Sequence, residues 1–209
     1  MANGFGVPSR AQGRPRSKRA RQAILDAAGE LLERDGFAAV TVEAIAARAG
    51  VSKATIYRWW PNKAAVVTDS FLELTAPEIH FENTGSARED LRLQMQKLAQ
   101  VFSGQSGRVV AALVAESVFD ADVATAFRSR WISARREETR RVVERGIINE
   151  EFRSDLDVEA AIDALYGPIY YRLLVRHLPL EPGFVDALAD HVINGLEATS
   201  DAPNGRGKE

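Results

Sequence analysis

The segment SKATIYRWW, residues 52–60, combines side chains that can hydrogen-bond to nucleic acid with three aromatic rings. With successive residues placed about 100° apart, as in an α-helix, Ile56 and Trp60 share one face. The opposite face and its flanks carry small, polar or basic side chains, namely Ala54, Thr55, Tyr57 and Arg58. Such a helix fits the DNA major groove, where a bulky apolar side chain would block access to the base edges.

Helical counting does not assign two residues of this segment clearly to either face. Lys53 falls nearer the apolar face by the same count, but it stands in the first turn on a flexible stem that can reach outward. Trp59 has two interpretations of about equal weight, which are packing against the following helix and contact with DNA. The segment thus predicts an apolar inner pair and a polar outer surface.

The flanking residues predict that this segment is the second helix of a helix-turn-helix. Thr41 is a suitable N-cap for a helix of about two turns, and Gly50 ends that helix. After one further residue Ser52 is a second N-cap, and Pro61 closes the second helix. Two short helices joined by a tight turn that contains glycine form a helix-turn-helix.

An amphipathic helix precedes this motif and completes a head of three helices. It is expected to begin at Arg21 and to end at Gly36, a residue suited to the position after a helix. Its apolar side chains recur at the spacing of one helical face: Ile24, Ala27, Ala28, Leu31 and Leu32.

Residues 41–63, TVEAIAARAGVSKATIYRWWPNK, resemble the DNA-binding signature of the TetR family of bacterial transcriptional regulators. The resemblance covers residues 20–67 and implies a three-helix DNA-binding head, an effector-binding helical body and a homodimer. For the recognition helix, which starts after the cap Ser52, it implies base contacts from Lys53, Ala54, Thr55 and Arg58. The phosphate contacts that it implies come from Thr41, Tyr57, Trp59 and Lys63.

Two positions depart from the family pattern. Trp59 stands where the family often has histidine or tyrosine, and tryptophan offers only one N–H donor. Glu43 stands where some members present a basic side chain that reads bases. A carboxylate at that place repels phosphates, although it can accept a hydrogen bond from cytosine.

The charge of the chain is unevenly distributed. The net charge is −2, but residues 1–63 hold 11 basic against 5 acidic side chains, whereas the remainder holds 16 against 24. A basic first third joined to an acidic body indicates that only the first third meets a polyanion.

Composition argues against several other classes of protein. No apolar run is long enough to span a membrane and no signal sequence is evident, so we expect a cytoplasmic protein. The chain has no cysteine, and its three histidines, His80, His177 and His191, are scattered. It also lacks a phosphate-binding glycine loop and a zinc motif. We therefore expect no enzymatic activity, no cofactor and no metal site.

The first twenty residues, rich in Gly, Pro, Ser and Arg, predict a flexible basic arm over residues 1–20. Within it, Gly13-Arg14-Pro15-Arg16 resembles the core of an AT-hook, an extended segment that lies in the minor groove of A·T-rich DNA. The favoured alternative is a solvated tail in which Arg14, Arg16 and Lys18 add non-specific attraction to phosphates.

The remaining chain predicts a helical domain for effector binding and dimerisation over residues 68–198, after a helix-turn-helix domain over residues 21–67. A flexible tail follows over residues 199–209. A long helix in this domain carries the charged run RREETRR, residues 135–141. We interpret this run as a solvated face with ion pairs at helical spacing, Glu137 with Arg141 and Arg140 with Glu144.

The last two helices of this domain are expected to form the dimer interface. Pro168, which lacks a backbone donor, should kink the first of them, residues 157–177. The two helices should pair with their copies to form a four-helix interface. The candidate interface residues are Leu173, Phe184, Leu188 and Ile193.

Large aromatic side chains of the same domain are candidates for an effector pocket: Phe102, Trp131, Tyr166 and Tyr170. For any single one of these residues, the alternative that its ring belongs to the ordinary core is favoured. An effector that fits such a lining is a small organic molecule, partly apolar.

These observations predict an all-α protein: a three-helix helix-turn-helix head followed by a helical-bundle domain for effector binding and dimerisation. The predicted function is a ligand-responsive transcriptional regulator, most simply a repressor, that binds a palindromic double-stranded DNA operator as a homodimer. A small-molecule effector would release it. The alternative is a non-specific, architectural DNA-binding protein without effector control, whose specific and non-specific affinities would be alike.

Overall fold

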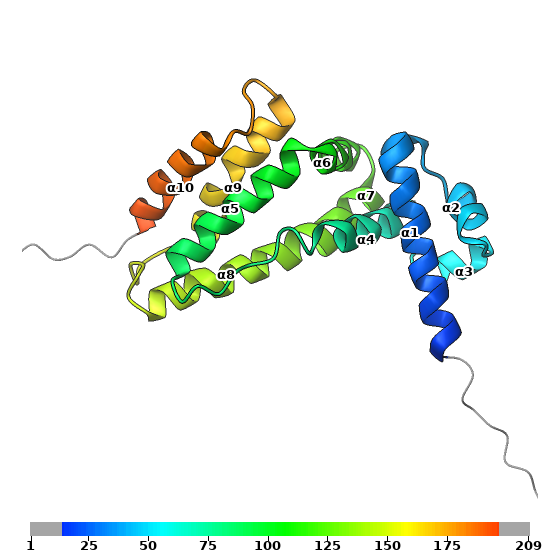
Figure 1. Cartoon of the computed structure of the whole chain (residues 1–209), viewed down its shortest axis with the longest axis horizontal. Helices are drawn as coiled ribbons and strands as arrows, with labels where there is room; N and C mark the ends of the chain where they lie inside the picture. Colours follow the sequence, from blue (N-terminus) through cyan, green and yellow to red (C-terminus); the bar gives the residue numbers. More distant parts are fainter. Residues whose placement is uncertain (1–13, 197–209) are drawn as a thin grey trace, which may run out of the picture.

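The computed structural model describes residues 14–196, with side chains from residue 17 onward. Eleven helical segments and no strand occur in that range, which confirms the predicted all-α fold. Figure 1 shows a head of α1, α2 and α3 at one end of the molecule and a larger helical body at the other. No helix of residues 14–196 is long and apolar enough to cross a membrane.

The head is built on one apolar face of α1 (Arg14–Ala39). Ile24 and Leu32 on that face are buried in the same core as Ile45 of α2 (Val42–Ala49) and Ile56 of α3 (Lys53–Tyr57). Gly36, with φ of 77°, interrupts the helical backbone near the end of α1. A side chain is disfavoured at that φ, so glycine ends the helix proper where it was expected to.

Helix α1 begins at Arg14 rather than at Arg21. The prediction of a flexible arm is therefore wrong for residues 14–20. Pro15 is compatible with the first turn, where its missing N–H has no intrahelical partner, and the Arg, Lys and Ala residues that follow favour a helix. Residues 1–13, and with them Gly13 of the AT-hook-like segment, lie outside the described residues, as do residues 197–209.

Helix α4 (Lys63–Thr75) runs from the head into the body and packs against α1. Asn62 caps it by accepting a hydrogen bond from the Ala65 N–H at 2.9 Å. The hydroxyl of Ser70 donates to the Leu25 carbonyl at 2.6 Å. Gly29 allows this close approach, because a Cβ there would lie 3.0 Å from the Ser70 hydroxyl.

The body surrounds α5 (Ala87–Ser103), which packs against α6 (Gln105–Ser117), α8 (Ser133–Ile148), α9 (Val158–Val175) and α10 (Pro182–Leu196). The apolar stripe of α5, from Leu91 to Phe102, is buried. Two long-range polar contacts fix its N-terminus. The carboxylate of Glu151 accepts the Ala87 N–H at 2.9 Å, and buried Asp90 pairs with Arg145.

One continuous helical path connects α7 (Ala121–Ala126) to α8, as the sequence predicts for a long helix. Its middle part, η1 (Phe127–Ile132), is π-helical, with the Ser133 N–H bonded to the Arg128 carbonyl five residues earlier. This wider turn was not predicted. A π-helical turn shifts all later side chains around the helix axis, and such turns are frequent at functional sites.

The charged run of residues 135–141 is only partly the solvated face that was expected. Glu137 and Arg141 form the predicted ion pair, with Oε1 and Nε 3.4 Å apart. Arg140 instead lies 2.5 Å from a carboxylate oxygen of Glu159 on α9. Thr139 is buried, so one side of this run faces the interior.

Helix α9 runs through Pro168 without ending. It stops at Arg176, which adopts a left-handed conformation with φ of 56°.

Candidate DNA interface and effector pocket

The helix-turn-helix has the local hydrogen bonds that its caps require. Thr41 Oγ1 accepts the Ala44 N–H at 3.1 Å, and Ser52 Oγ accepts the Thr55 N–H at 3.3 Å. Gly50 between the helices has φ of 65°, and its N–H points back to carbonyls at the end of α2. These local contacts fix the direction in which α3 leaves the turn.

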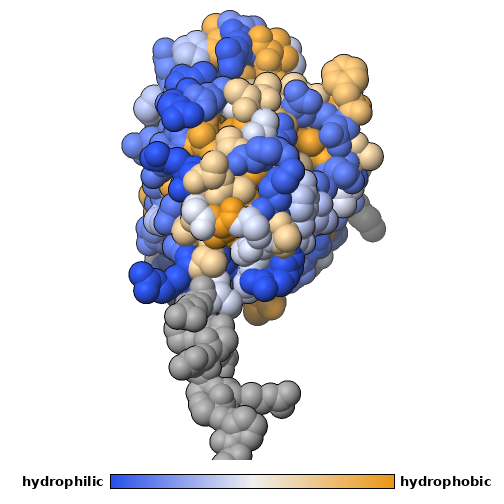
Figure 2. Space-filling view, turned by 90° about the vertical axis from the view of Figure 1, so that its right-hand side faces the viewer, coloured by the Kyte–Doolittle hydropathy of each residue, from blue (hydrophilic) through white to orange (hydrophobic). Residues whose placement is uncertain are grey.

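The recognition helix α3 divides into the two faces that helical counting predicts. Ile56 and Trp60 are 1% and 2% exposed and close the head core, which confirms their inward placement. The exposed side chains are Ser52, Lys53, Ala54, Tyr57 and Arg58. Thr55 is half-buried, and its hydroxyl lies 3.0 Å from that of Ser52. Figure 2, which faces the outer side of the head, shows hydrophilic residues interspersed with apolar ones on that surface.

Regular helix in α3 is shorter than predicted, because it ends at Tyr57 and not near Pro61. Residues 58–60 continue as a turn in which the Trp59 and Trp60 N–H groups both bond to the Ile56 carbonyl, at 2.9 and 3.0 Å. This tighter turn brings Trp60 into the core. Trp59 stays 38% exposed, with its ring centroid 6.4 Å from that of Trp60.

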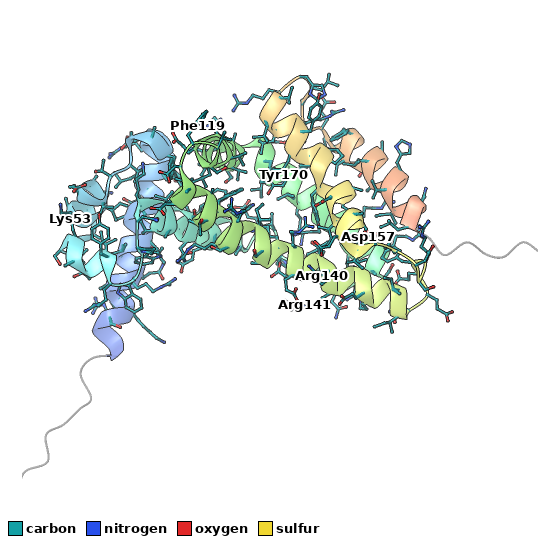
Figure 3. All side chains as sticks on the ribbon, turned by 180° about the vertical axis from the view of Figure 1, so that it is seen from behind. Lys53, Phe119, Arg140, Arg141, Asp157 and Tyr170 are labelled. Atoms are coloured by element: carbon teal, nitrogen blue, oxygen red, sulfur yellow. The ribbon has the colours of Figure 1, made fainter. Side chains whose placement is uncertain are left out.

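Lys53 is paired with Glu43 across the two helices of the motif, with Nζ 2.8 Å from Oε1. The hydrogen bond from Lys53 lowers the pKa of Glu43, and the same bond raises the pKa of Lys53. Both side chains are exposed, and in Figure 3 Lys53 lies on the side of the head away from the body. The pair places a carboxylate beside a predicted base contact.

The side chain of Lys63, predicted to contact a phosphate, interacts instead with Phe37 of the same protomer. Its Nζ donates to the Phe37 carbonyl at 3.1 Å and lies 4.2 Å from the centre of the Phe37 ring. Of the arm residues, Lys18 is exposed on α1. Arg14 and Arg16 start the same helix, but their side chains lie outside the described part of the structure.

A carboxylate that was not predicted from the sequence to have a role, that of Asp69, connects the head to the body. Asp69 of α4 accepts the Trp60 Nε1–H at 2.7 Å and lies 2.6 Å from Nη1 of Arg130 on η1. Trp60 supports the recognition helix, whereas Arg130 belongs to the π-helical segment of the body. Asp69 therefore connects the two parts.

A cavity of about 320 Å³ lies in the body between α5, α6, η1, α8 and α9. Two of the four predicted ligand-binding residues, Tyr166 and Tyr170, line it. Figure 3 shows Tyr170 inside the body, between the helices. The apolar part of the lining consists of Leu98, Val114, Phe127, Ile132 and Ile162.

The other two predicted ligand residues, Trp131 and Phe102, do not line this cavity. Trp131 is fully buried, with its ring 4.9 Å from that of Phe71 and 6.4 Å from that of Phe102. Phe102 is also buried and borders a different, more open hollow beside Arg172. Both rings are core behind Tyr170, whose hydroxyl accepts the Trp131 Nε1–H at 2.9 Å.

The polar part of the cavity lining includes two residues that were not predicted from the sequence, Gln94 and Arg135. A signal for Arg135 was present. It lies four residues after Trp131 and four before buried Thr139, so it continues the inward stripe of the long helix. The charged run around it concealed this stripe.

Two of the predicted dimer residues are buried inside the protomer, so their prediction as interface residues is wrong. Leu173 and Ile193 lie in the core of the protomer itself, 6% and 0% exposed. Phe184 and Leu188 are half-buried, and Phe184 lies beneath the guanidinium of Arg172. Large apolar side chains do remain exposed at the end of α9 and just after it: Tyr171, Leu174, Val175 and Leu178.

Fold and site together define a DNA-binding protein of the helix-turn-helix class. Two family models match the chain: "Bacterial regulatory proteins, tetR family" over residues 24–69 and "Tetracyclin repressor-like, C-terminal domain" over residues 81–192. The chain belongs to the TetR family of bacterial transcriptional regulators.

Relatives and solved structures agree with this family. The HTH-type transcriptional regulator YdeS of Bacillus subtilis (strain 168) is 41% identical over 189 residues, which cover 90% of this chain and 96% of YdeS. The DNA-binding transcriptional repressor TetR of Mycobacteroides abscessus is 27% identical over 175 residues, 82% of this chain and 90% of the relative. The crystal structure of the TetR family regulator SCO0332 has a TM-score of 0.77 at 34% identity, covering 85% and 98% of the two chains.

Proposed function

We propose that this regulator is a repressor, which binds a palindromic operator as a homodimer and leaves it when a small organic effector enters the body. The observation that carries the proposal is the division of the recognition helix, with Ile56 and Trp60 fixed in the core and Lys53 and Arg58 exposed. Repression is supported by the relative from Mycobacteroides abscessus, which is named a repressor.

The exposed side of the motif supplies the proposed DNA contacts. Around the cap Ser52, base edges are contacted by Lys53, Ala54, Thr55 and Arg58, since Arg and Lys can donate to guanine and a small residue allows close approach. Phosphates are contacted by Thr41, Tyr57, Trp59 and Lys63, and the basic start of α1 adds Arg14, Arg16 and Lys18. The exposed part of Trp59 supports a contact from its indole N–H, its only donor.

A homodimer follows from the size of the recognition helix. One helix of five residues contacts too few base pairs to specify a site. Two copies spaced about 34 Å apart read two half-sites on one face of DNA. The exposed apolar side chains at the end of α9, namely Tyr171, Leu174, Val175 and Leu178, are the proposed interface, with Phe184 and Leu188 at its edge.

The cavity of the body is the proposed effector site. It adjoins η1 through Phe127 and Ile132, and η1 reaches the head through Arg130 and Asp69. An effector that changes the packing of η1 would shift the two heads away from the half-site spacing. Coupling of about 1–3 kcal/mol between the two sites is typical of such control.

Footprinting of the purified protein on DNA upstream of its own coding region tests the proposal. We expect one protected site with two-fold symmetry and an affinity at least about 10³-fold above that for unrelated DNA at the same salt concentration. An architectural DNA-binding protein would protect DNA without preference. Equal affinities for the two DNAs would therefore disprove the specific regulator and favour the alternative.

A further inference from the structure

We propose that the effector is a small monoanion, a carboxylate on an apolar body, whose charge is bound by Arg135. This inference rests on the proposed function in taking the cavity of the body as the effector site. Its evidence is the chemistry of the cavity lining, which is mostly apolar but includes an arginine that forms no ion pair with the described residues and an unsatisfied acceptor.

The apolar lining and the size of the cavity limit the body of the ligand. Five aliphatic or aromatic side chains from four helical segments surround the space: Leu98, Val114, Phe127, Ile132 and Ile162. A volume of about 320 Å³ lies at the lower end of the range for small-molecule sites. The cavity therefore fits a compact apolar group and not an extended polar one.

Two neighbouring arginines of α8 line the cavity, and they differ in how their charge is neutralised. Arg136 is paired twice with α9, with Asp163 at 2.5 Å and with Glu159. For Arg135 no carboxylate partner occurs among the residues that the structure describes. Asp163 also borders the cavity but is paired with Arg136, and Glu138, beyond ion-pair distance, is the carboxylate that attracts Arg135.

Arg135 is half-buried, and the buried part of its guanidinium includes Nε. Its guanidinium lies 4.0 Å from the centre of the Trp131 ring, and its Nε is buried without a hydrogen-bond acceptor. Burial lowers the pKa of Arg135. The Trp131 ring attracts the cation, but a buried N–H without an acceptor is destabilising, and a bound carboxylate would supply both a negative charge and the missing acceptor.

Gln94 and Tyr170 indicate further contacts of the same ligand. Gln94 is 3% exposed, and its Nε2 donates to the Ile79 carbonyl at 2.8 Å, which leaves Oε1 without a donor. The Tyr170 hydroxyl accepts from Trp131, so its own hydrogen remains free to bond a carboxylate. A hydroxyl or N–H on the apolar body of the ligand would satisfy Gln94.

Two dyes with the same ring system test the charge requirement. 1-Anilinonaphthalene-8-sulfonate is a monoanion, whereas N-phenyl-1-naphthylamine is neutral. We expect the full-length wild-type protein to bind the anion at least tenfold more tightly than the neutral dye. Arg135→Gln should lose at least tenfold of the affinity for the anion and keep that for the neutral dye, while Arg135→Lys should retain most of the preference.

A matched control is Arg141→Gln, the same substitution on the exposed side of the same helix, where Figure 3 shows Arg141 pointing away from the cavity. This variant should bind both dyes as the wild type does. A wild type without preference for the anion, or an Arg135→Gln variant that binds the anion normally, would overturn the proposal. Circular dichroism melting of each variant confirms that it is folded.

Competition then tests the carboxylate. Octanoate and 4-phenylbutyrate are expected to displace the anionic dye, and their neutral amides are not. Failure of both carboxylates, or equal displacement by the amides, would overturn the assignment of ligand class. Because these assays contain no DNA, a failed footprint would disprove the proposed repressor while leaving the dye result intact, and normal footprinting with no role for Arg135 would disprove only this inference.

Discussion

Asp69 and Arg130 form the ion pair that joins the DNA-binding head to the body, with Arg130 Nη1 2.6 Å from both carboxylate oxygens of Asp69. The same carboxylate accepts the hydrogen bond of the Trp60 indole at 2.7 Å. Trp60 closes the core behind the recognition helix, and Arg130 belongs to the π-helical segment beside the cavity. Any rearrangement of that segment acts directly on the group that supports the head.

A double-mutant cycle with Asp69→Asn and Arg130→Gln measures this connection. We expect a coupling energy of about 1–2 kcal/mol in the free energy of unfolding, because the pair is partly buried and shares its carboxylate with Trp60. The control cycle uses Arg153 and Asp155, whose ion pair is well exposed. Coupling no larger than in that control, typically 0–1 kcal/mol for exposed pairs, would contradict a structural connection at Asp69.

Glu43 should weaken DNA binding in the wild type, because its carboxylate forms an ion pair with Lys53 and repels phosphates. Glu43→Gln is expected to tighten binding several-fold in fluorescence anisotropy titrations at low salt, and the gain should shrink as salt rises. The control is Glu116→Gln, which removes the same charge from an exposed position on α6 of the body. Unchanged or weaker binding by Glu43→Gln would mean that the carboxylate itself contacts the DNA favourably.

The basic N-terminal residues are expected to bind DNA phosphates. Deletion of residues 1–16 removes three arginines, Arg10, Arg14 and Arg16. Binding should weaken, and the slope of log K against log salt should fall by up to about 0.9 for each phosphate that these arginines neutralise in the full chain. A slope equal to that of the full chain would show that these residues neutralise no phosphate.

The proposed dimer interface depends on the exposed apolar end of α9. Leu174→Glu is expected to convert the protein to a monomer and to abolish binding to the symmetric operator, since an unpaired charge in an apolar interface is costly. Ile148→Glu, at a more exposed apolar side chain at the end of α8, should leave the dimer intact. Light scattering coupled to gel filtration distinguishes the two outcomes, and a dimeric Leu174→Glu would place the interface elsewhere.

Asp90 should make the fold sensitive to acid. Burial opposes its charge, but hydrogen bonds from the Thr84 N–H and hydroxyl, at 2.9 and 2.7 Å, and the Arg145 ion pair lower its pKa overall. A lowered pKa in the folded state stabilises the fold above the unfolded value of about 4, and this stability is lost as the pH falls through the folded value.

Asp90→Asn is therefore expected to cost about 2 kcal/mol in urea unfolding at pH 7, and less as the pH approaches 3. Asp155→Asn, at a well-exposed position, is the control and should change little. A cost for Asp90→Asn that does not depend on pH would show that the charge of Asp90 is not the source of stability.

The recognition motif was predictable from the sequence because its determinants are local. Thr41, Gly50 and Ser52 act on backbone groups within a few residues, and the inward placement of Ile56 and Trp60 follows from helical periodicity. The end of α3 was the exception. Pro61 sets only the last position at which the helix can end. Nothing in the sequence of residues 58–60 indicates the tight turn found there.

The effector cavity and the connection to the head were decided by tertiary structure. Asp69 and Arg130 are 61 residues apart, and no local pattern pairs them. Arg135 stands in a run whose charges suit ion pairs along the helix surface, and its spacing from Trp131 is too weak a signal to decide which side of the helix meets its neighbours. That choice depends on how α8 packs against α5 and α9, and on a π-helical turn that rotates every side chain after it.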